Sequence, residues 1–154
     1  MALYTGRFVV SVDGKGRIAV PARLRGVAVT RGSDQFVLNK GMEGCIDLLG
    51  DSDWAKIEER VKPSHPIANK DERFYLRDFY SNMVPAPTDT QGRVLVPAFL
   101  LKHAGIEKEA LILGVGEKIE IWNQAKYEAY FSDFGESPEQ VAERIIRRFE
   151  KPDA

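Results

Sequence analysis

The sequence predicts a mainly β fold with short helices, built from two tandem copies of one unit. The first observation behind this is a repeat: residues 13–22, DGKGRIAVPA, return as DTQGRVLVPA at 89–98, with six identities in ten. The second is that short apolar runs of strand length surround both copies. The third is that glycine and proline punctuate these runs at matching places, which indicates turns between strands.

The first copy opens with a hairpin. Phe8, Val10 and Val12 occupy every second position, which predicts a strand. Residues 13–16 supply turn chemistry, because an Asp side chain can hydrogen-bond its own backbone and Gly accepts a positive φ. Residues 17–20 are then expected to form the return strand.

A short helix is expected after each hairpin. Pro21 suits the first position of the helix and Gly26 suits its end, and Pro97 and Gly105 repeat that pair in the second copy.

Two further strands complete each copy. In the first copy they cover 36–38 and 45–49 around a turn at Lys40-Gly41, and the stretch ALILGVGEKIEIW from Ala110 repeats the pattern. A unit of about 50 residues buries little surface alone, so the two copies are expected to share one core.

Helical patterns outside the copies predict a connector of helices. A helix that begins near Asp53 is broken by Pro63 and Pro66. Asn69 and Glu72 then have the spacing of a capping box, which predicts the start of a second helix. Its apolar stripe is formed by Leu76, Phe79, Tyr80 and Met83.

The C-terminal stretch carries its own helix signals. Ser137 can cap, Pro138 suits the first turn, and Gln140 completes a capping box. The apolar stripe consists of Val141, Ile145, Ile146 and Phe149. This helix can pack on its own domain or on a neighbouring subunit. The predicted organisation is therefore a first repeat at 5–53, a helical connector at 54–81, a second repeat at 82–126 and a helical tail at 127–154.

Bulk composition describes an ordinary globular chain, with 44% hydrophobic and 29% charged residues. No apolar run approaches the roughly 20 residues that cross a bilayer, and the N-terminus lacks the features of a signal peptide. The single cysteine, Cys45, lies in an apolar stretch and is expected to be a small core residue. These features favour a cytosolic protein.

Charge is distributed unevenly along the chain. The formal net charge is −1, yet the first 31 residues hold six cations and one acid, Asp13. A basic end on an otherwise acidic chain suggests a surface that faces a polyanion, although a solvated charged face would look the same.

Motifs for catalysis are absent from the sequence. The chain has two histidines, His65 and His103, and no Cys/His cluster with zinc spacing. The glycines of DGKGR precede a strand rather than a helix, so they do not form a phosphate-binding P-loop. We therefore expect no enzyme activity, no catalytic residues, no metal, no cofactor and no small-molecule ligand.

With these motifs in view, the chain resembles the MraZ family of bacterial transcriptional regulators, and each unit looks like the SpoVT-AbrB swapped-hairpin domain. The motifs that carry the resemblance are DGKGR at 13–17 with Val20-Pro21, DTQGR at 89–93 with Val96-Pro97, NKDER at 69–73, and GVG at 114–116 followed by IEIW at 119–122. Family members often carry Arg where this chain has Thr5.

The resemblance implies a double-split β-barrel of AbrB/MraZ type, in which the two units interleave, and ring-like homo-oligomers. It also implies a cytoplasmic, nucleoid-associated repressor that binds short repeats of double-stranded DNA in the promoter of its own division and cell-wall gene cluster.

Within that resemblance, the DGKGR hairpin is the predicted DNA-binding element. A two-stranded ribbon fits the major groove, and Arg17 can present a planar fork to guanine O6 and N7. Lys15 suits a phosphate or a guanine edge, and Gly14 and Gly16 permit close backbone approach. Contacts to the flanking phosphates are predicted for Arg7, Arg23 and Arg25.

Structural readings of the same residues stay open. Asp13 and Asp89 can cap their turns, and Arg17 and Arg93 can be structural arginines that pair with them, with Arg93 as a secondary DNA contact. The second tip reads Thr90-Gln91, so it has lost a glycine and a cation. The alternative function is an oligomeric protein-binding module of the same fold, antitoxin-like or an adaptor.

Overall fold

The computed structural model describes residues 2–61 and 69–150. It divides into two compact units, Met1–Gln124 and Ala125–Ala154, so both repeats belong to one unit. Pro63, His65 and Pro66 lie outside the described residues.

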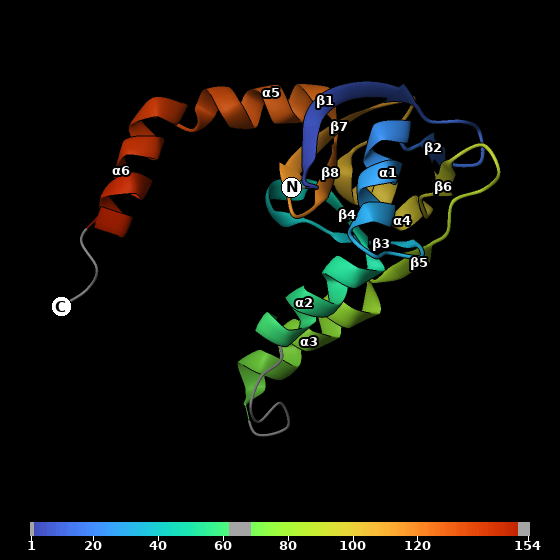
Figure 1. The fold of residues 1–154 in the computed structure, drawn as a ribbon, viewed down its shortest axis with the longest axis horizontal. Helices are drawn as coiled ribbons and strands as arrows, with labels where there is room; N and C mark the ends of the chain where they lie inside the picture. Colours follow the sequence, from blue (N-terminus) through green and yellow to red (C-terminus); the bar gives the residue numbers. More distant parts are fainter. Residues whose placement is uncertain (1, 62–68, 151–154) are drawn as a thin grey trace. The chain divides into compact units, whose positions relative to one another are not determined.

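The first unit contains a six-stranded antiparallel sheet and a two-stranded one (Figure 1). In the larger sheet the order is β1 (Tyr4–Ser11), β7 (Glu109–Gly116), β8 (Ile119–Trp122), β4 (Ile46–Gly50), β3 (Phe36–Lys40) and β5 (Val84–Ala86). The smaller sheet pairs β2 (Arg17–Ala19) with β6 (Arg93–Leu95). Strands β1, β2, β3 and β4 all pair with strands from beyond residue 81, so the two repeats interleave.

The predicted hairpin is only partly correct. After the turn at 13–16, β2 pairs with β6 of the other repeat, and a single bridge, Val12 to Ile18, links it to the preceding strand. The exchange places Ile18 and Val94, both 0% exposed, in one core shared by the two repeats. Burial of these two apolar side chains favours the pairing of β2 with β6.

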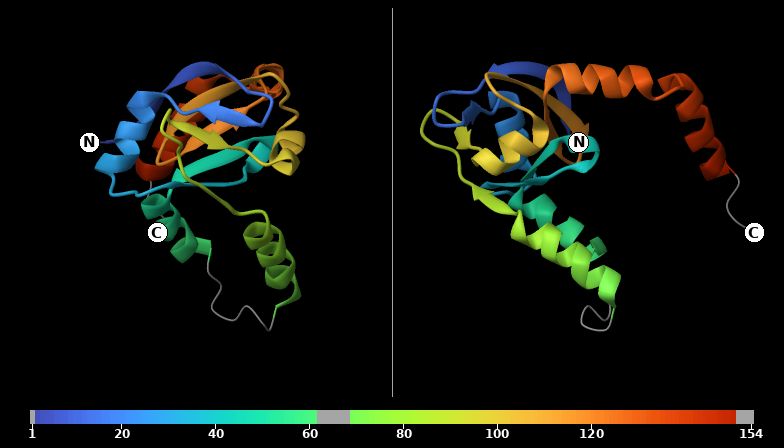
Figure 2. Two further views of the ribbon diagram at one scale, coloured as in Figure 1. Left: turned by 90° about the vertical axis from the view of Figure 1, so that its right-hand side faces the viewer. Right: turned by 180° about the vertical axis from the view of Figure 1, so that it is seen from behind.

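Helices α1 (Ala22–Thr30) and α4 (Ala98–Ala104) follow β2 and β6 (Figure 2). The prediction for α4 is confirmed: Pro97 precedes it and Gly105 ends it with φ of 66°. The prediction that Gly26 ends the first helix is wrong, because α1 continues through it to Thr30. Leu24 and Ala28 are buried one turn apart, which favours continued helix across Gly26.

Helices α2 (Asp51–Val61) and α3 (Lys70–Ser81) form the connector. The Asn69 side chain accepts hydrogen bonds from the backbone N–H groups of Asp71 and Glu72, which confirms the predicted cap. Phe79 stacks on Trp54 of α2 at 5.0 Å between ring centroids, so aromatic contacts hold the two helices together.

The second unit begins at Ala125, the second residue of α5 (Gln124–Asp133), and contains α6 (Pro138–Glu150). The predicted capping box is present in both directions, since Ser137 N donates to Gln140 Oε1 and Gln140 N donates to Ser137 Oγ. Phe131, Ile146 and Phe149 are exposed, and the aromatic side chains of α5 and the apolar side chains of α6 line a shallow hollow of about 290 Å³.

The fold is mixed α/β with antiparallel sheets, so the prediction of a mainly β fold is confirmed only in part. More of the described residues lie in helices than in strands, because four of the helices lie outside the two repeat motifs and the strands are short. Within the described residues the larger sheet is open, with β1 and β5 at its edges.

Candidate nucleic-acid interface

The DGKGR turn is held by its own aspartate. Asp13 Oδ1 accepts hydrogen bonds from the backbone N–H groups of Lys15 and Arg17, both at 2.9 Å, and Oδ2 accepts from Arg17 Nε at 2.6 Å. The backbone bond from Arg17, together with the bonds from its side chain and from Lys15, lowers the pKa of Asp13 to about 2. The carboxylate therefore stays ionised at neutral pH and holds the Arg17 side chain in one orientation.

The second turn repeats this arrangement. Asp89 Oδ1 accepts from the N–H groups of Gln91 and Arg93, and Oδ2 accepts from Arg93 Nε at 2.8 Å. The backbone bond from Arg93 is the main reason that the pKa of Asp89 also lies below its usual value. The Asp-x-x-Gly-Arg motif is thus a turn-forming device in both copies.

The two turns meet across the ribbon formed by β2 and β6. Arg17 lies opposite Leu95 in the register and Ala19 lies opposite Arg93. Arg93 Nη1 also lies 3.7 Å from Asp13 Oδ2, so Arg93 faces two carboxylates. Among the described residues, none accepts a hydrogen bond from the Nη groups of Arg17, whose side chain is 32% exposed.

The two glycines of the first turn have different roles. Gly16 has φ of +86°, and a Cβ there would lie 2.9 Å from the Val96 carbonyl oxygen, so the fold itself requires glycine. Gly14 is exposed, and a Cβ there would meet no atom within 4 Å. Only Gly14 is therefore available to let another molecule approach.

The predicted basic residues lie in different settings. Lys15 and Arg7 are exposed, and none of the described residues hydrogen-bonds the Lys15 ammonium group. Arg23 donates to Thr5 Oγ1 and to the Thr5 carbonyl oxygen, both at 3.0 Å. The Arg25 guanidinium is turned toward the fold, since its Nε donates to the Val20 carbonyl oxygen and the side chain lies against the second turn at Gly92.

Arg31, one of the six cations near the N-terminus, turns inward. Its guanidinium donates to both carboxylate oxygens of Asp53, and Nη1 donates to the Ala2 carbonyl oxygen. Tyr4 completes the cluster, and burial followed by the charge of Asp53 raises the pKa of Tyr4 to about 12. The partners lie 22 residues apart, so no local signal in the sequence could have identified this ion pair.

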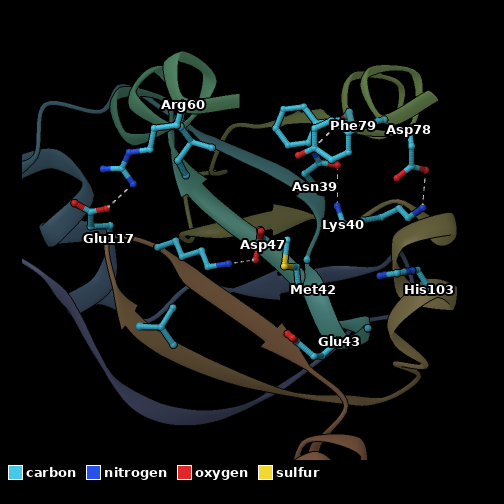
Figure 3. A pocket seen from close by; sticks show the side chains of 16 residues that line it. Asn39, Lys40, Met42, Glu43, Asp47, Arg60, Asp78, Phe79, His103 and Glu117 are labelled. Atoms are coloured by element: carbon cyan, nitrogen blue, oxygen red, sulfur yellow. Dashed lines mark hydrogen bonds and ion pairs between the residues drawn. The ribbon is translucent and has the colours of Figure 1, made fainter. Parts of the chain in front are cut away.

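A wide groove elsewhere in the first unit has a different character (Figure 3). Its volume is about 740 Å³, and its cations already face carboxylates. Lys40 Nζ lies 2.8 Å from Asp78 Oδ1, and Arg60 Nη1 lies 3.6 Å from Glu117 Oε2. These pairs leave the groove without an excess of positive charge for nucleic acid.

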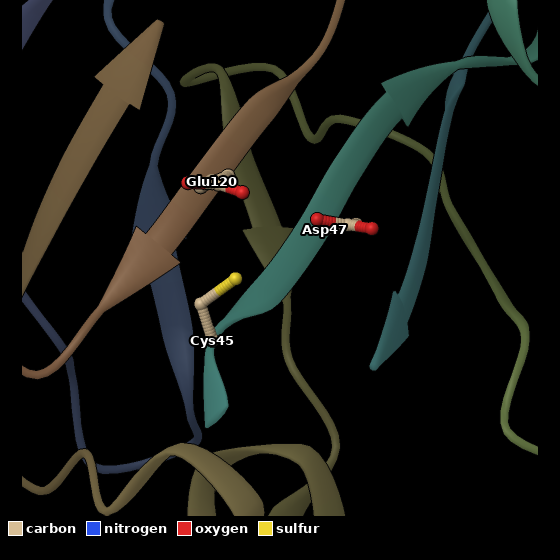
Figure 4. Close-up of side chains that lie close together, drawn as sticks. All are labelled: Cys45, Asp47 and Glu120. Carbon is tan, nitrogen blue, oxygen red and sulfur yellow. The ribbon is translucent and has the colours of Figure 1, made fainter. Parts of the chain in front are cut away.

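Cys45, Asp47 and Glu120 form a cluster with the ligand types of a metal site (Figure 4). The ammonium group of Lys118 lies 2.9 Å from Asp47 Oδ1 and 3.3 Å from Glu120 Oε2, where it neutralises both carboxylates. Cys45 is buried as predicted, and burial raises the pKa of its thiol, which makes it a poor ligand. Asp47 also has a raised pKa, mainly because of burial.

Within residues 2–61 and 69–150, no helix is both long and apolar enough to cross a bilayer.

Comparison with known proteins identifies the family of the chain. The family model for the MraZ protein, whose description also notes a likeness to antitoxins, matches residues 3–78 and again residues 81–149. The chain belongs to the MraZ family. The resemblance seen in the motifs is thereby confirmed.

Three relatives illustrate the similarity, and each is named as the transcriptional regulator MraZ. The chain is 38% identical to the protein of Pelotomaculum thermopropionicum over 144 residues, covering 94% of this chain and 96% of the relative. It is 36% identical to the protein of Alkaliphilus oremlandii, covering 93% and 96%. It is also 36% identical to that of Heliobacterium modesticaldum, covering 94% and 97%. The chain is thus a transcriptional regulator of this family rather than an enzyme.

Proposed function

We propose that this regulator binds double-stranded promoter DNA through the first turn and the ribbon of β2 and β6. The observation that carries the proposal is the state of Arg17. Asp13 holds its Nε, and none of the described residues accepts a hydrogen bond from the two Nη groups, which lie close in the chain to the exposed Lys15. A guanidinium fixed at one edge is pre-organised for a planar acceptor pair.

Guanine presents such a pair in the major groove. Its O6 and N7 accept a bidentate contact from arginine, which contributes about 1–3 kcal/mol of discrimination against other bases. A two-stranded ribbon fits that groove. Gly14 keeps the tip slim, and Lys15 supplies a second cation for a phosphate or a guanine edge.

Residues around the ribbon are proposed to hold the DNA backbone. Arg7 on β1 and Arg23 on α1 are exposed and suit phosphate oxygens. Arg25 is partly buried beside the second turn, so it contributes chiefly by supporting that turn and through the positive field of the surface. Arg93 is a secondary contact, because two carboxylates already face it.

Assembly is the second part of the proposal. One ribbon makes few contacts, whereas a ring that presents several identical ribbons raises avidity by about 10² to 10⁴ on repeated promoter boxes. The exposed apolar side chains of α5 and α6 offer a surface that assembly would cover. We further propose that the interleaved repeats, bounded at 5–53 and 82–126, form the double-split barrel of the family, with 54–81 as connector and 127–154 as tail.

In this view the protein acts in the cytoplasm at the nucleoid and represses its own division and cell-wall gene cluster by blocking RNA polymerase. The test is a mobility shift on the DNA upstream of its own gene, with wild type and with Lys15→Ala/Arg17→Ala. We expect the double variant to lose binding while its mass in size-exclusion chromatography stays that of the wild type.

The matched control is Lys56→Ala/Lys70→Ala, which removes two exposed cations from the connector and is expected to bind as the wild type does. Binding by wild type should also weaken steeply with added salt. If the first double variant still shifts promoter DNA, the proposed site is wrong. If the wild type does not bind promoter DNA, the result favours the alternative function, an oligomeric protein-binding module.

A further inference from the structure

The outer face of the β2–β6 ribbon carries an apolar side chain that the core does not use. Ile18 and Val94 point inward and are 0% exposed, whereas Leu95, the next residue along β6, points outward and is 55% exposed. Successive strand residues face opposite sides, so Leu95 lies on the same face as Arg17 and Ala19.

Leu95 stands directly beside the proposed DNA contact. It is the register partner of Arg17, and residues opposite each other in antiparallel strands are about 4.5–5.5 Å apart at Cα. Its Cδ1 would lie 4.0 Å from a Cβ placed on Gly16, so the side chain lies over the end of the first turn.

The repeat makes this placement asymmetric. The residue that matches Leu95 in the first copy is Ala19, which faces Arg93 across the ribbon. The ribbon therefore carries an arginine beside a large apolar group at one end, and an arginine beside a methyl group at the other.

The major groove offers one apolar feature among its polar base edges, the C5-methyl group of thymine. Neighbouring base pairs are about 3.4 Å apart along the helix axis, so side chains from an opposed pair such as Arg17 and Leu95 reach adjacent base pairs. We propose that Leu95 reads the methyl group of a thymine next to the guanine that Arg17 contacts. This inference rests on the proposed function, and it adds a second specificity-determining residue, supplied by the other repeat.

Deoxyuridine tests the inference because it differs from thymidine only by lacking that methyl group. Affinity is measured by titration on two otherwise identical promoter fragments, one with thymine and one with deoxyuridine in the boxes. For the wild type we expect binding about fourfold weaker on the deoxyuridine fragment, the change that loss of one buried methyl group brings. Leu95→Ala is expected to bind the two fragments within a factor of about 1.5 of each other, a margin set by the same methyl-scale effect.

The matched control is Val29→Ala, which trims an apolar side chain that is 72% exposed on α1, and it should keep the wild-type ratio. Equal binding of the two fragments by the wild type would overturn the role of Leu95 while leaving DNA binding intact. A Leu95→Ala variant that changes particle mass but keeps the wild-type ratio would also overturn it, because Leu95 would then be a subunit contact. A wild type that binds neither fragment would refute the proposed function itself.

Discussion

The turns at Asp13 and Asp89 share one backbone design and differ in what they offer to a partner. In both, an aspartate accepts two backbone N–H groups and the Nε of the arginine four residues on. The first turn adds an exposed glycine and lysine where the second has threonine and glutamine. Arg17 faces one carboxylate and Arg93 faces two. The shared residues of the motif therefore build the turn, and the residues that differ give the first turn its proposed function.

The largest expected effect is the difference in stability between removing a buried ion pair and removing the exposed ion pair of the second turn. The first repeat carries the Arg31–Asp53 pair, with side chains 12% and 2% exposed, whereas the Asp89–Arg93 pair is 34% and 28% exposed. We expect Asp53→Ala to lower the free energy of unfolding by about 3–5 kcal/mol, because it leaves a buried guanidinium without its carboxylate.

Asp89→Ala removes the exposed pair and its turn bonds, and we expect a clearly smaller loss of stability than for Asp53→Ala, because solvent screens the exposed pair. Urea denaturation of both variants measures the difference. Equal losses would show that burial of the Arg31–Asp53 pair adds no stability beyond that of the exposed pair.

DNA affinity separates the two arginines. We expect Arg17→Ala to weaken binding to a single promoter box by about ten- to a hundredfold, the range of one bidentate guanine contact. Arg93→Ala is expected to cost less than about threefold, because that guanidinium is already engaged by Asp89 and Asp13. Fluorescence anisotropy at fixed salt gives both values, and a larger loss for Arg93→Ala would reverse the assignment of the two turns.

Alanine substitutions at the two glycines of the first turn test whether Gly16 serves the fold and Gly14 serves DNA binding. Gly16→Ala should destabilise the protein by about 1–3 kcal/mol, because φ is positive and the added Cβ collides with the Val96 carbonyl oxygen. Gly14→Ala should change stability by less than about 0.5 kcal/mol, the range of surface substitutions, and should still weaken DNA binding if the tip enters the groove. Thermal melts and anisotropy on the same samples compare the pair. A stable Gly16→Ala variant would contradict the structural role of that glycine.

The smallest expected effect is the pH dependence of the Asp13 cap. Its pKa is lowered from 3.8 to about 2 in the folded protein, so the stability that it contributes is complete above the unfolded value and is lost as the pH falls through about 2. The difference in melting temperature between wild type and Asp13→Asn should be constant from pH 8 to about 5 and shrink below pH 4. A difference that vanishes already near pH 6 would mean that the carboxylate is not held by these bonds.

Local signals in the sequence were sufficient for the caps and for the repeat. Asn69, Ser137 and Gly105 lie where their chemistry places helix ends, and the spacing of the motif identified both turns. The pairing of β2 was harder to predict, because the strand could pair with β1 in a local hairpin or with β6 of the other repeat. Burial of Ile18 in the shared core favours β6. The outward side chain of Leu95 depends on the same pairing of β2 with β6. The inward orientation of Arg31 depends instead on Asp53, which lies 22 residues further along the chain.

The most direct test of the central claim, that the first turn enters the DNA groove, is site-specific cross-linking. Lys15→Cys and Lys70→Cys proteins are each incubated with promoter DNA that carries a thiol tether in the boxes; the buried Cys45 does not compete, because its pKa is raised. We predict efficient disulfide cross-linking at position 15 and only background at position 70. Cross-linking at position 70 equal to that at position 15, or none at position 15 while the DNA stays bound, would contradict the account.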